Sequence, residues 1–409
     1  MARSKHFFSV PAFILISALS ACENVEGTDA VNQSQEVTRV ISETSPEALS
    51  ECGAATIISD DRARVLEKAN AYLDAQPETV TANRAERSTG GPNDFYSEGD
   101  YWWPVPGKPD APYEQRDGQT NPDNFVAHRL SMIRLSDIMG SLASAYLVTG
   151  EQKYADAAAE HLETRMNPNL LYAQAIKGRH TGRSIGIIDT LHLIETARSA
   201  KVLGESGALP EEDYDAVIDW FDDYSNWMNT HPNGIEEREW PNNHSIAWSL
   251  QIAAFSDLTG NQELMDHVRG KFKNWYLPDM MNDEGGFPKE LARTKPYGYS
   301  LFVIDLMGGI AQIASTDTDN LWTYTTANDH NMKLGLDFIT PYIKDKSAWP
   351  YAEDVSYWED WPVRHPALLF GAKALKDCSY YKTVKDLPAD SEIYEVTRNF
   401  PIRHPIIWL

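Results

Sequence analysis

The sequence predicts an all-α protein, an α/α toroid built as an incomplete barrel of helical hairpins in a single domain. From about residue 56 onward, apolar residues recur at three- and four-residue spacing, the period of an amphipathic helix. Connections between these segments are short, and strand-like alternation is scarce. The alternative, an α-solenoid, would show a recurring signature of roughly 34 or 40 residues, which is not found. We therefore expect inner and outer helices packed in rings, with loops at one end forming a site.

The expected helices can be placed in order along the chain. The first covers residues 61–73, and a long second helix covers 124–147 before the turn at Thr149-Gly150. A helix over 153–166 follows after a short connection, as in an antiparallel hairpin. The same alternation then predicts helices over 184–203, 213–228, 245–259, 262–275, 300–314 and 332–343.

One long segment, residues 90–122, breaks this pattern. It is rich in Pro, Gly and aromatic residues and has little helical period. A loop of this length in a compact domain is usually either functional or disordered. The cluster Tyr101-Trp102-Trp103 argues against disorder, and such rings can also stack against sugar rings. We therefore expect these three residues to help bind a ligand.

The N-terminus has the pattern of an export signal followed by a tether. Basic residues precede an apolar stretch, 7–19, which is too short for a permanent membrane span. The stretch ends in a lipoprotein-type box at Cys22, so residues 1–22 are expected to be the signal, with Cys22 receiving a lipid. Glu23 in place of Asp favours the outer membrane. Residues 23–55 have the polar composition of a flexible tether. An ordinary cleaved signal with a chance Cys is the alternative.

Charge and cysteine content limit the possible partners. The formal net charge of −24 argues against binding nucleic acid over the whole surface. An anionic ligand would need a local basic cleft. Beyond Cys22 only Cys52 and Cys378 remain; an oxidising compartment would allow them to pair, but their spacing leaves this open. No Cys/His spacing typical of a metal site appears, so we expect no metal or other cofactor, and the sequence leaves the oligomeric state open.

Two polar segments about fifty residues apart carry groups suited to acid–base chemistry. The first includes Asn242, Asn243 and His244, just ahead of the helix expected from residue 245. One Asn can cap that helix, and a helix N-terminus disfavours the imidazolium form of His244. The second segment contains Arg293 and Tyr299. Nearby cations are expected to lower the pKa of this tyrosine. The alternatives are a capping Asn with a structural His, and a solvated basic loop.

Further candidates lie close to these segments. A Gly-rich basic loop, residues 177–184, leads into a helix start and contains Arg179, His180 and Arg183. Basic side chains and free N–H groups there favour an anion site, although a solvated loop is the alternative. Acidic residues that could act in glycoside hydrolysis instead are Glu236, Glu237 and Glu239, or Asp283 and Glu284.

Several of these motifs, taken in order, resemble an alginate-lyase superfamily domain. They are 94–104, Pro109-Asp-Ala-Pro-Tyr, Arg116-Asp-Gly, Arg183-Ser-Ile-Gly-Ile-Ile-Asp-Thr, Asn242-Asn243-His244, and Arg293 followed by a Tyr. The resemblance covers roughly residues 60–375. The sequence is similar to polysaccharide lyase family 5 and more similar to family 38. The resemblance implies an α/α toroid acting on uronate polymers without a required metal, so that residues 56–409 form the lyase domain.

The resemblance also implies residue roles. Asn243 and Arg293 would neutralise the substrate carboxylate, while His244 and Tyr299 would move protons. Family 5 has its Tyr seven residues after the Arg, where this chain has Ser300; Tyr299 fits the family 38 spacing, with Tyr297 in reserve. From the sequence itself, the residues expected to bind substrate are Arg179, His180, Arg183, Trp102, Trp103, Tyr101, Asn242, Trp248, Lys289 and Tyr297.

The function implied is cleavage of a β-1,4-linked uronate polymer by β-elimination, with polymannuronate-type alginate or glucuronan as substrate. The expected partners are this anionic polysaccharide and, through the N-terminal lipid alone, a membrane; nucleic acid is not expected. Two alternatives stay open. One is a glycoside hydrolase on a similar toroid, and the other is a non-catalytic outer-membrane glycan-binding lipoprotein.

Overall fold

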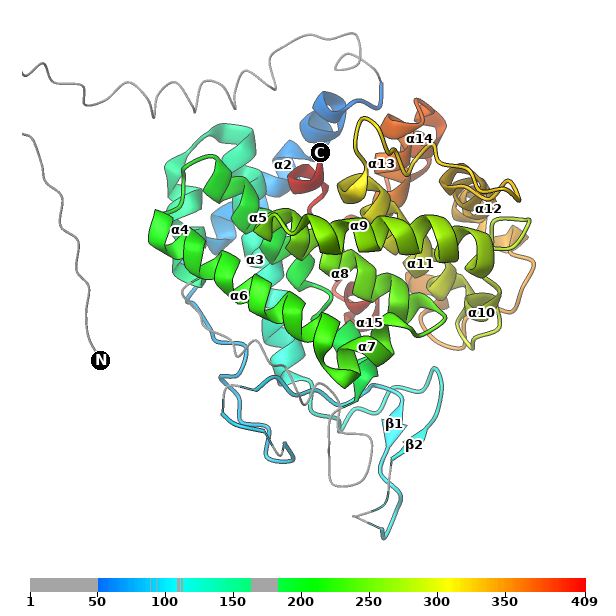
Figure 1. The fold of residues 1–409 in the computed structure, drawn as a ribbon, viewed down its shortest axis with the longest axis horizontal. Helices are drawn as coiled ribbons and strands as arrows, with labels where there is room; N and C mark the ends of the chain where they lie inside the picture. The colour runs from blue at the N-terminus through cyan, green and yellow to red at the C-terminus, as the bar shows by residue number, and fades with distance from the viewer. Residues whose placement is uncertain (1–50, 89, 93, 109–110, 112, 163–182) are drawn as a thin grey trace, which may run out of the picture.

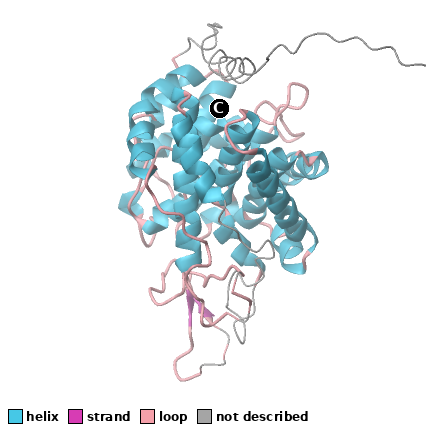
Figure 2. Ribbon diagram, turned by 90° about the vertical axis from the view of Figure 1, so that its left-hand side faces the viewer, coloured by secondary structure: helices cyan, strands magenta, loops and turns pink. Residues whose placement is uncertain are grey.

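The computed structural model describes residues 51–409 except 89, 93, 109–110, 112 and 163–182, and it confirms the all-α prediction. Helices make up most of the molecule, and the short hairpin of strands projects at one end (Figure 2). The hairpin pairs β1 (Trp102–Trp103) with β2 (Glu114–Gln115) in antiparallel register. It belongs to the aromatic segment that the sequence singled out.

Five helices form an inner row, and an outer helix follows each of them in the chain (Figure 1). Successive inner helices pack against one another: α3 (Ala127–Thr149), α5 (Leu193–Glu205), α8 (Asn243–Thr259), α11 (Pro296–Ala314) and α13 (Pro366–Ala374). Their outer partners are α4 (Gln152–Leu162), α6 (Glu211–Thr230), α9 (Gln262–Lys271), α12 (Met332–Lys344) and α14 (Cys378–Val384). α8 and α11 are apolar nearly all round and buried nearly all round, as expected of inner helices.

The remaining elements connect or flank these pairs. The helices are α2 (Ala54–Tyr72), which packs on α3, and the short α7 (Pro232–Arg238), α10 (Pro288–Leu291) and α15 (Tyr394–Arg398). Tighter 3₁₀ turns are η1 (Ser184–Thr190), η3 (Lys346–Ala348), η4 (Trp358–Asp360) and η5 (Pro405–Trp408), and η2 (Phe272–Met280) is a π-helix.

The two ends of the helix array are tied together. Cys52, just before α2, forms a disulfide with Cys378 at the start of α14, the pairing that the sequence left open. Nearby, Arg364 donates to Asp61 of α2 at 2.7 Å. The first helix is therefore fixed to the last hairpin, and α2 begins at Ala54, inside the segment expected to be a tether.

The predicted helix boundaries were wrong in four places, the first being α2, which begins at Ala54 instead of 61. The single helix expected over 184–203 is split into η1 and α5, and the one expected to end at 275 continues as η2. α11 begins at Pro296 instead of 300. Proline suits a first helical position, and the Asp354 carboxylate accepts hydrogen bonds from the N–H groups of Tyr297 and Gly298, which have no partner within the helix. Tyr299 therefore lies within the first turns of α11.

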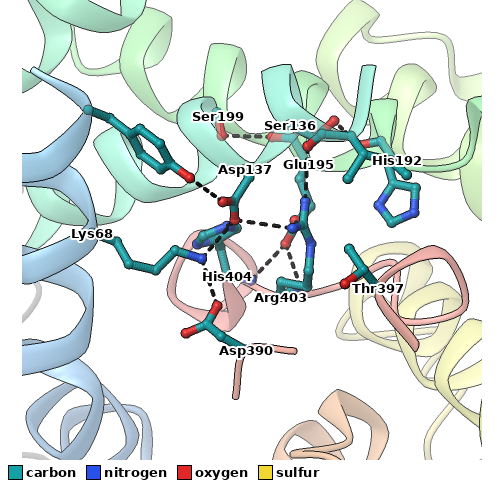
Figure 3. Close-up of polar contacts among 12 residues, drawn as sticks. Lys68, Ser136, Asp137, His192, Glu195, Ser199, Asp390, Thr397, Arg403 and His404 are labelled. Atoms are coloured by element: carbon teal, nitrogen blue, oxygen red, sulfur yellow. Dashed lines mark hydrogen bonds and ion pairs between the residues drawn. The ribbon is translucent and has the colours of Figure 1, made fainter. Parts of the chain in front are cut away.

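The C-terminal segment, residues 399–409, fills the interior of the helix array. Arg403 and His404 donate their backbone N–H groups to the buried Glu195 carboxylate at 2.8 and 2.7 Å, and the His404 ring contacts Asp137 at 3.0 Å (Figure 3). Asp137 also binds Lys68 of α2. The segment starts after α15 and ends at the face opposite the β1–β2 hairpin (Figures 1 and 2).

Candidate active site

A cleft lies beside the β1–β2 hairpin. Its space of about 570 Å³ includes some open solvent. Residues far apart in the sequence line it: Gly99, Asp100, Tyr101, Trp102, Gln115, Arg129, Ile185, Ile188, Asp189, Asn243, His244, Arg293, Tyr299, Phe302, Arg398 and Asn399. All four residues expected to do chemistry, Asn243, His244, Arg293 and Tyr299, are therefore brought to one cleft.

The two adjacent asparagines at the start of α8 have different tasks. The Asn242 side chain caps the helix by accepting from the His244 N–H at 3.0 Å, and Asn242 does not line the cleft. Asn243 does line it. The buried Glu290 carboxylate of α10 binds both the backbone N–H of Asn243, at 2.8 Å, and its side-chain Nδ2, at 2.7 Å. The predicted binding role of Asn242 is thus replaced by a structural one, because its oxygen is used by the helix.

His244 is paired with a buried carboxylate. Its Nδ1 lies 2.6 Å from Oε1 of Glu237, which is fully buried at the end of α7. Burial raises the pKa of Glu237, and the nearby His244 opposes that rise. A carboxylate on Nδ1 favours the tautomer with hydrogen on Nδ1, which leaves Nε2 free to accept a proton. The pair therefore has the arrangement of an oriented general base.

Arg293 is held by the loop that follows β2. Its Nη2 and Nε donate to the two oxygens of Asp117 at 2.6 and 3.2 Å, and the Thr294 hydroxyl donates to the same carboxylate. The guanidinium also lies over the Tyr299 ring, 4.2 Å from its centre. A forked contact of this kind fixes the plane of the guanidinium. About one quarter of the Arg293 side chain is exposed, so it can meet an anion in the cleft.

Tyr299 is the phenol of the cleft. Its hydroxyl accepts from Arg293 Nη2 at 3.1 Å and donates to the Tyr101 hydroxyl at 3.3 Å. Burial raises the pKa of Tyr299 to about 12, despite the opposing effect of Arg293 and Arg398. The predicted effect of nearby cations is present, but the expected net lowering of the Tyr299 pKa was wrong. Desolvation of the phenolate outweighs the two guanidinium groups.

Beneath Tyr299 lies a network of buried charges. The Tyr101 hydroxyl donates to Glu395 of α15 at 2.9 Å, and Glu395 also forms ion pairs with Lys295 and Arg398. Burial alone would raise the pKa of Glu395, but Arg398 and Lys295 together lower it to about 2. Tyr101 is only 8% exposed and holds the Lys295 ammonium over its ring. It lines the cleft as a support for Tyr299, and not as the open sugar platform that the sequence predicted.

A second pair of carboxylates fixes the deepest cation of the cleft. Arg129 of α3 is almost fully buried and binds Asp100 at 2.6 Å and Asp189 of η1 at 2.8 Å. Arg398 also reaches Asp100, at 2.9 Å. Opposite charges at this depth must be paired, because an unpaired buried ion is very costly. The network joins the aromatic segment, η1 and α15 behind one wall of the cleft.

The other predicted binding residues are divided by the structure. Trp102 lines the cleft, and the Arg183 guanidinium lies 5.3 Å from its ring centre. Trp103 is half-buried beside the cleft with Arg116 over its ring at 4.8 Å, and Lys289 is exposed; neither lines the cleft. Arg179, His180 and Cys22, the residue expected to receive a lipid, lie outside the described residues.

Two predicted binding residues are instead part of the core. Trp248 lies on the inner helix α8, fully buried, with its indole N–H donating to the Met228 carbonyl. Tyr297 is also fully buried; its hydroxyl donates to the Tyr342 carbonyl and its ring packs against Trp349. A polymer in the cleft cannot reach either ring, so these two predictions were wrong. Both aromatics were needed for packing.

The carboxylates suggested for glycoside hydrolysis are not arranged as a pair across the cleft. Glu237 is committed to His244, while Glu236 and Glu239 are exposed outside the cleft lining. The Asp283 side chain is 97% exposed, and its carboxylate lies 3.1 Å from His330 Nε2. Within the described ranges, no group of three His, Cys, Asp or Glu side chains is placed to hold a metal ion.

Several residues of the site were not assigned their roles from sequence, and four of them show why. Glu290 lies in a segment that was singled out, and Glu237 was noted for a different chemistry. Arg398 and Asn399 come from the C-terminal region, beyond the stretch that resembles a known family. No local pattern marks the last two, because only the return of the chain to the barrel brings them to the cleft.

The chain is similar to one protein family and to proteins of known structure. The sequence matches the family described as Alginate lyase over residues 79–349. An alginate lyase from Bacteroides ovatus of known crystal structure is 27% identical, with a TM-score of 0.74 over 93% of this chain and 98% of that one. Alginate lyase A1-III from Sphingomonas species A1 is 15% identical, with a TM-score of 0.47 over 78% of this chain and 86% of that one. No curated protein sequence matches.

Proposed function

The chain belongs to the alginate lyase family, and on this basis we propose that it cleaves β-1,4-linked uronate polymers by β-elimination. The observation that carries the proposal is the convergence of Asn243, His244, Arg293 and Tyr299 on one cleft. These residues come from the start of α8, the loop after α10 and the first turns of α11. They supply an amide, an imidazole, a guanidinium and a phenol to the same volume.

In the proposed reaction, Arg293 and Asn243 stabilise charge on the substrate carboxylate. The hydrogen on C5 of a uronate is very weakly acidic beside an ionised carboxylate. As a base removes it, negative charge spreads onto the carboxylate oxygens, where fixed N–H donors stabilise it most. Arg293, held by Asp117, and Asn243, held by Glu290, are both oriented before substrate arrives. The electron pair of the C5–H bond then forms the C4=C5 double bond as the C4–O4 bond breaks.

His244 and Tyr299 handle the protons in this proposal. The Glu237 contact leaves His244 Nε2 as an acceptor. Because burial raises the pKa of Tyr299 to about 12, its resting form at neutral pH is the phenol, which can protonate the departing O4. Where C5–H and O4 lie on the same side of the ring, His244 Nε2 can first take the phenol proton of Tyr299. The phenolate then removes the C5 proton and returns it to the departing O4. This same-side arrangement is the geometry of mannuronate and glucuronate.

We therefore propose polymannuronate-type alginate or glucuronan as the substrate, and an envelope location for the enzyme. The proposed anchor is a lipid on Cys22, with the outer membrane as the site of attachment. An anchored lyase of net charge −24 would need a local basic cleft to hold a polyanion. Arg293 and Arg398 are the arginines of the described chain that line the cleft together with the buried Arg129.

A substrate panel tests the proposal. Polymannuronate, polyguluronate, glucuronan and hyaluronan are each incubated with the purified protein, and ultraviolet absorbance of an unsaturated uronate is followed before mass analysis of the products. We expect absorbance to rise with polymannuronate or glucuronan and not with Tyr299→Phe. New reducing ends without that absorbance would indicate a hydrolase. Binding of a polymer without turnover, equal in wild type and Tyr299→Phe, would indicate a glycan-binding protein.

A further inference from the structure

We propose that Glu290 is a positioning residue that sets which way the Asn243 side-chain amide faces. The inference rests on the proposed function, because Asn243 matters to catalysis only if the chain eliminates a uronate. The structural relation itself can be examined without substrate. Glu290 belongs to the four-residue helix α10, is 1% exposed, and is not among the residues that line the cleft.

Both oxygens of Glu290 are used by Asn243. Oε1 accepts from the backbone N–H at 2.8 Å, and Oε2 accepts from Nδ2 at 2.7 Å. The backbone N–H of Asn243 is among the first in α8 and has no partner within the helix. The negative charge of the Glu290 carboxylate is therefore also favourable at this N-terminal end of the helix dipole. One buried side chain therefore fixes a backbone group and a side-chain group of the same residue.

The chemistry of the two groups determines the orientation of the amide. A carboxylate only accepts hydrogen bonds, so Nδ2 of Asn243 must face Glu290, and Oδ1 must face elsewhere. Nδ2 carries two hydrogens, and Glu290 takes one of them. The second hydrogen is left for the substrate carboxylate. A free asparagine could turn by half a rotation and present its oxygen, which would repel that carboxylate.

Glu290 also connects the two groups that would neutralise the substrate. The Glu290 backbone carbonyl accepts from the backbone N–H of Arg293 at 3.1 Å, while the Glu290 side chain binds Asn243. The loop that carries Arg293 is thereby fixed to the start of α8. A single residue outside the cleft lining thus contacts both the Asn243 amide and the backbone of Arg293.

Glu290→Gln is the variant that separates orientation from packing. The Asn243 backbone N–H cannot turn, so it keeps the oxygen of the introduced amide. The amino group of that amide must then face the Asn243 side chain, and two donors would meet. Asn243 is expected to turn so that its Oδ1 accepts from the introduced amino group, which reverses the groups that Asn243 offers to the cleft. The shape of the side chain at position 290 is nearly unchanged.

The kinetic test is a double-mutant cycle of Glu290→Gln with Asn243→Ala. We expect Glu290→Gln to lower kcat about 10²-fold, the effect of losing one preorganised donor, with KM changed less than about threefold. In the Asn243→Ala background the same change should have almost no effect on kcat, because the amide that it reorients is absent. An equal loss of kcat in both backgrounds would overturn the proposal.

Glu195→Gln is the matched control. Glu195 is also a fully buried carboxylate that binds two backbone N–H groups, those of Arg403 and His404, but it lies outside the cleft lining. Glu195→Gln should lower Tm but leave the orientation of the Asn243 amide unchanged, so kcat should stay within about threefold of wild type. A loss of kcat that simply follows the loss of Tm in both variants would assign Glu290 a structural role only.

A measurement without substrate distinguishes failure of the inference from failure of the proposed function. The side-chain amide resonance of Asn243, identified by its disappearance in Asn243→Ala, should be protected from solvent exchange in the wild type. In Glu290→Gln it should shift and exchange faster, because Nδ2 loses its acceptor. An unchanged resonance would refute the inference even if the wild type is an active lyase. A shifted resonance in a protein without lyase activity would support the orientation and reject the function.

Discussion

Replacing Glu237 by Gln should slow catalysis without destabilising the fold. Glu237 is fully buried, and its Oε1 lies 2.6 Å from His244 Nδ1. Its Oε2 makes no hydrogen bond to the described part of the chain. The variant removes a buried charge that is only partly compensated, so the free energy of unfolding should stay level or rise. The imidazolium that forms on His244 during proton abstraction would, however, lose its counter-ion.

The expected loss of kcat follows from the distance between the Glu237 carboxylate and the His244 imidazolium. Two unit charges about 4 Å apart interact by about 4 kcal/mol at an effective dielectric constant of about 20. The His244 side chain is 19% exposed, and solvent screening reduces the interaction to about 3 kcal/mol. At 1.36 kcal/mol for each factor of ten, kcat should fall roughly 10²-fold.

The assay is the initial rate of ultraviolet absorbance increase on the preferred polymer, together with a thermal melt of each variant. The neighbouring exposed Glu236 supplies a control: Glu236→Gln also removes one negative charge from α7 but has no contact with the imidazole. It should retain wild-type kcat. If Glu237→Gln also keeps kcat within about threefold of wild type, His244 does not act through a charge held by Glu237.

Three further predictions concern other parts of the chain. Tyr299→Phe should lower kcat at least about 10²-fold with little change in KM, since the proton donor is lost; turnover near the wild-type rate would reject its role. Because the pKa of Glu395 is about 2, below its ordinary 4.5, the stability that it contributes is complete above pH 4.5 and is lost as pH falls towards 2. Between pH 6 and pH 3, the free energy of unfolding measured in urea should fall by about 2 kcal/mol less in Glu395→Gln than in the wild type. Equal falls in the two proteins would contradict the ion pairs. Replacing Cys52 and Cys378 by Ser should cost about 2–4 kcal/mol of stability, measured by denaturant unfolding; no cost would show that the disulfide does not restrain the chain.

The elements that local pattern predicts best are those with a continuous apolar period. α8 and α12 begin and end within about two residues of their expected bounds, since the caps Asn242 and Asn331 and the closing Gly260 are local signals. The start of α11 was missed because its first turn is stabilised by Asp354, more than fifty residues away. A tertiary hydrogen bond of this kind leaves no mark on the neighbouring sequence.

The same distinction applies to the site. Asn243, His244, Arg293 and Tyr299 stand in two short segments, so order and spacing were enough to group them. Trp248 was expected to bind substrate, and it lies four residues after His244, on the same face of a helix. The helices packed around α8, however, bury most of its surface, and the Trp248 indole is covered, with its N–H donating to Met228 of α6. Sequence spacing can place a residue on a helix face, but the packing of the neighbouring helices decides whether that face is open.

The buried C-terminal segment has a consequence for the order in which the molecule can fold. The helices that surround residues 400–408 are all synthesised earlier, and their inward faces carry Glu195 and Asp137 as well as apolar side chains. Until the segment enters, those carboxylates lack Arg403 and His404, and the interior is underfilled. Its contacts join residues more than 200 positions apart, and such distant pairings form late and slowly. Completion of the core and arrival of Arg398 at the cleft should therefore be a single late event.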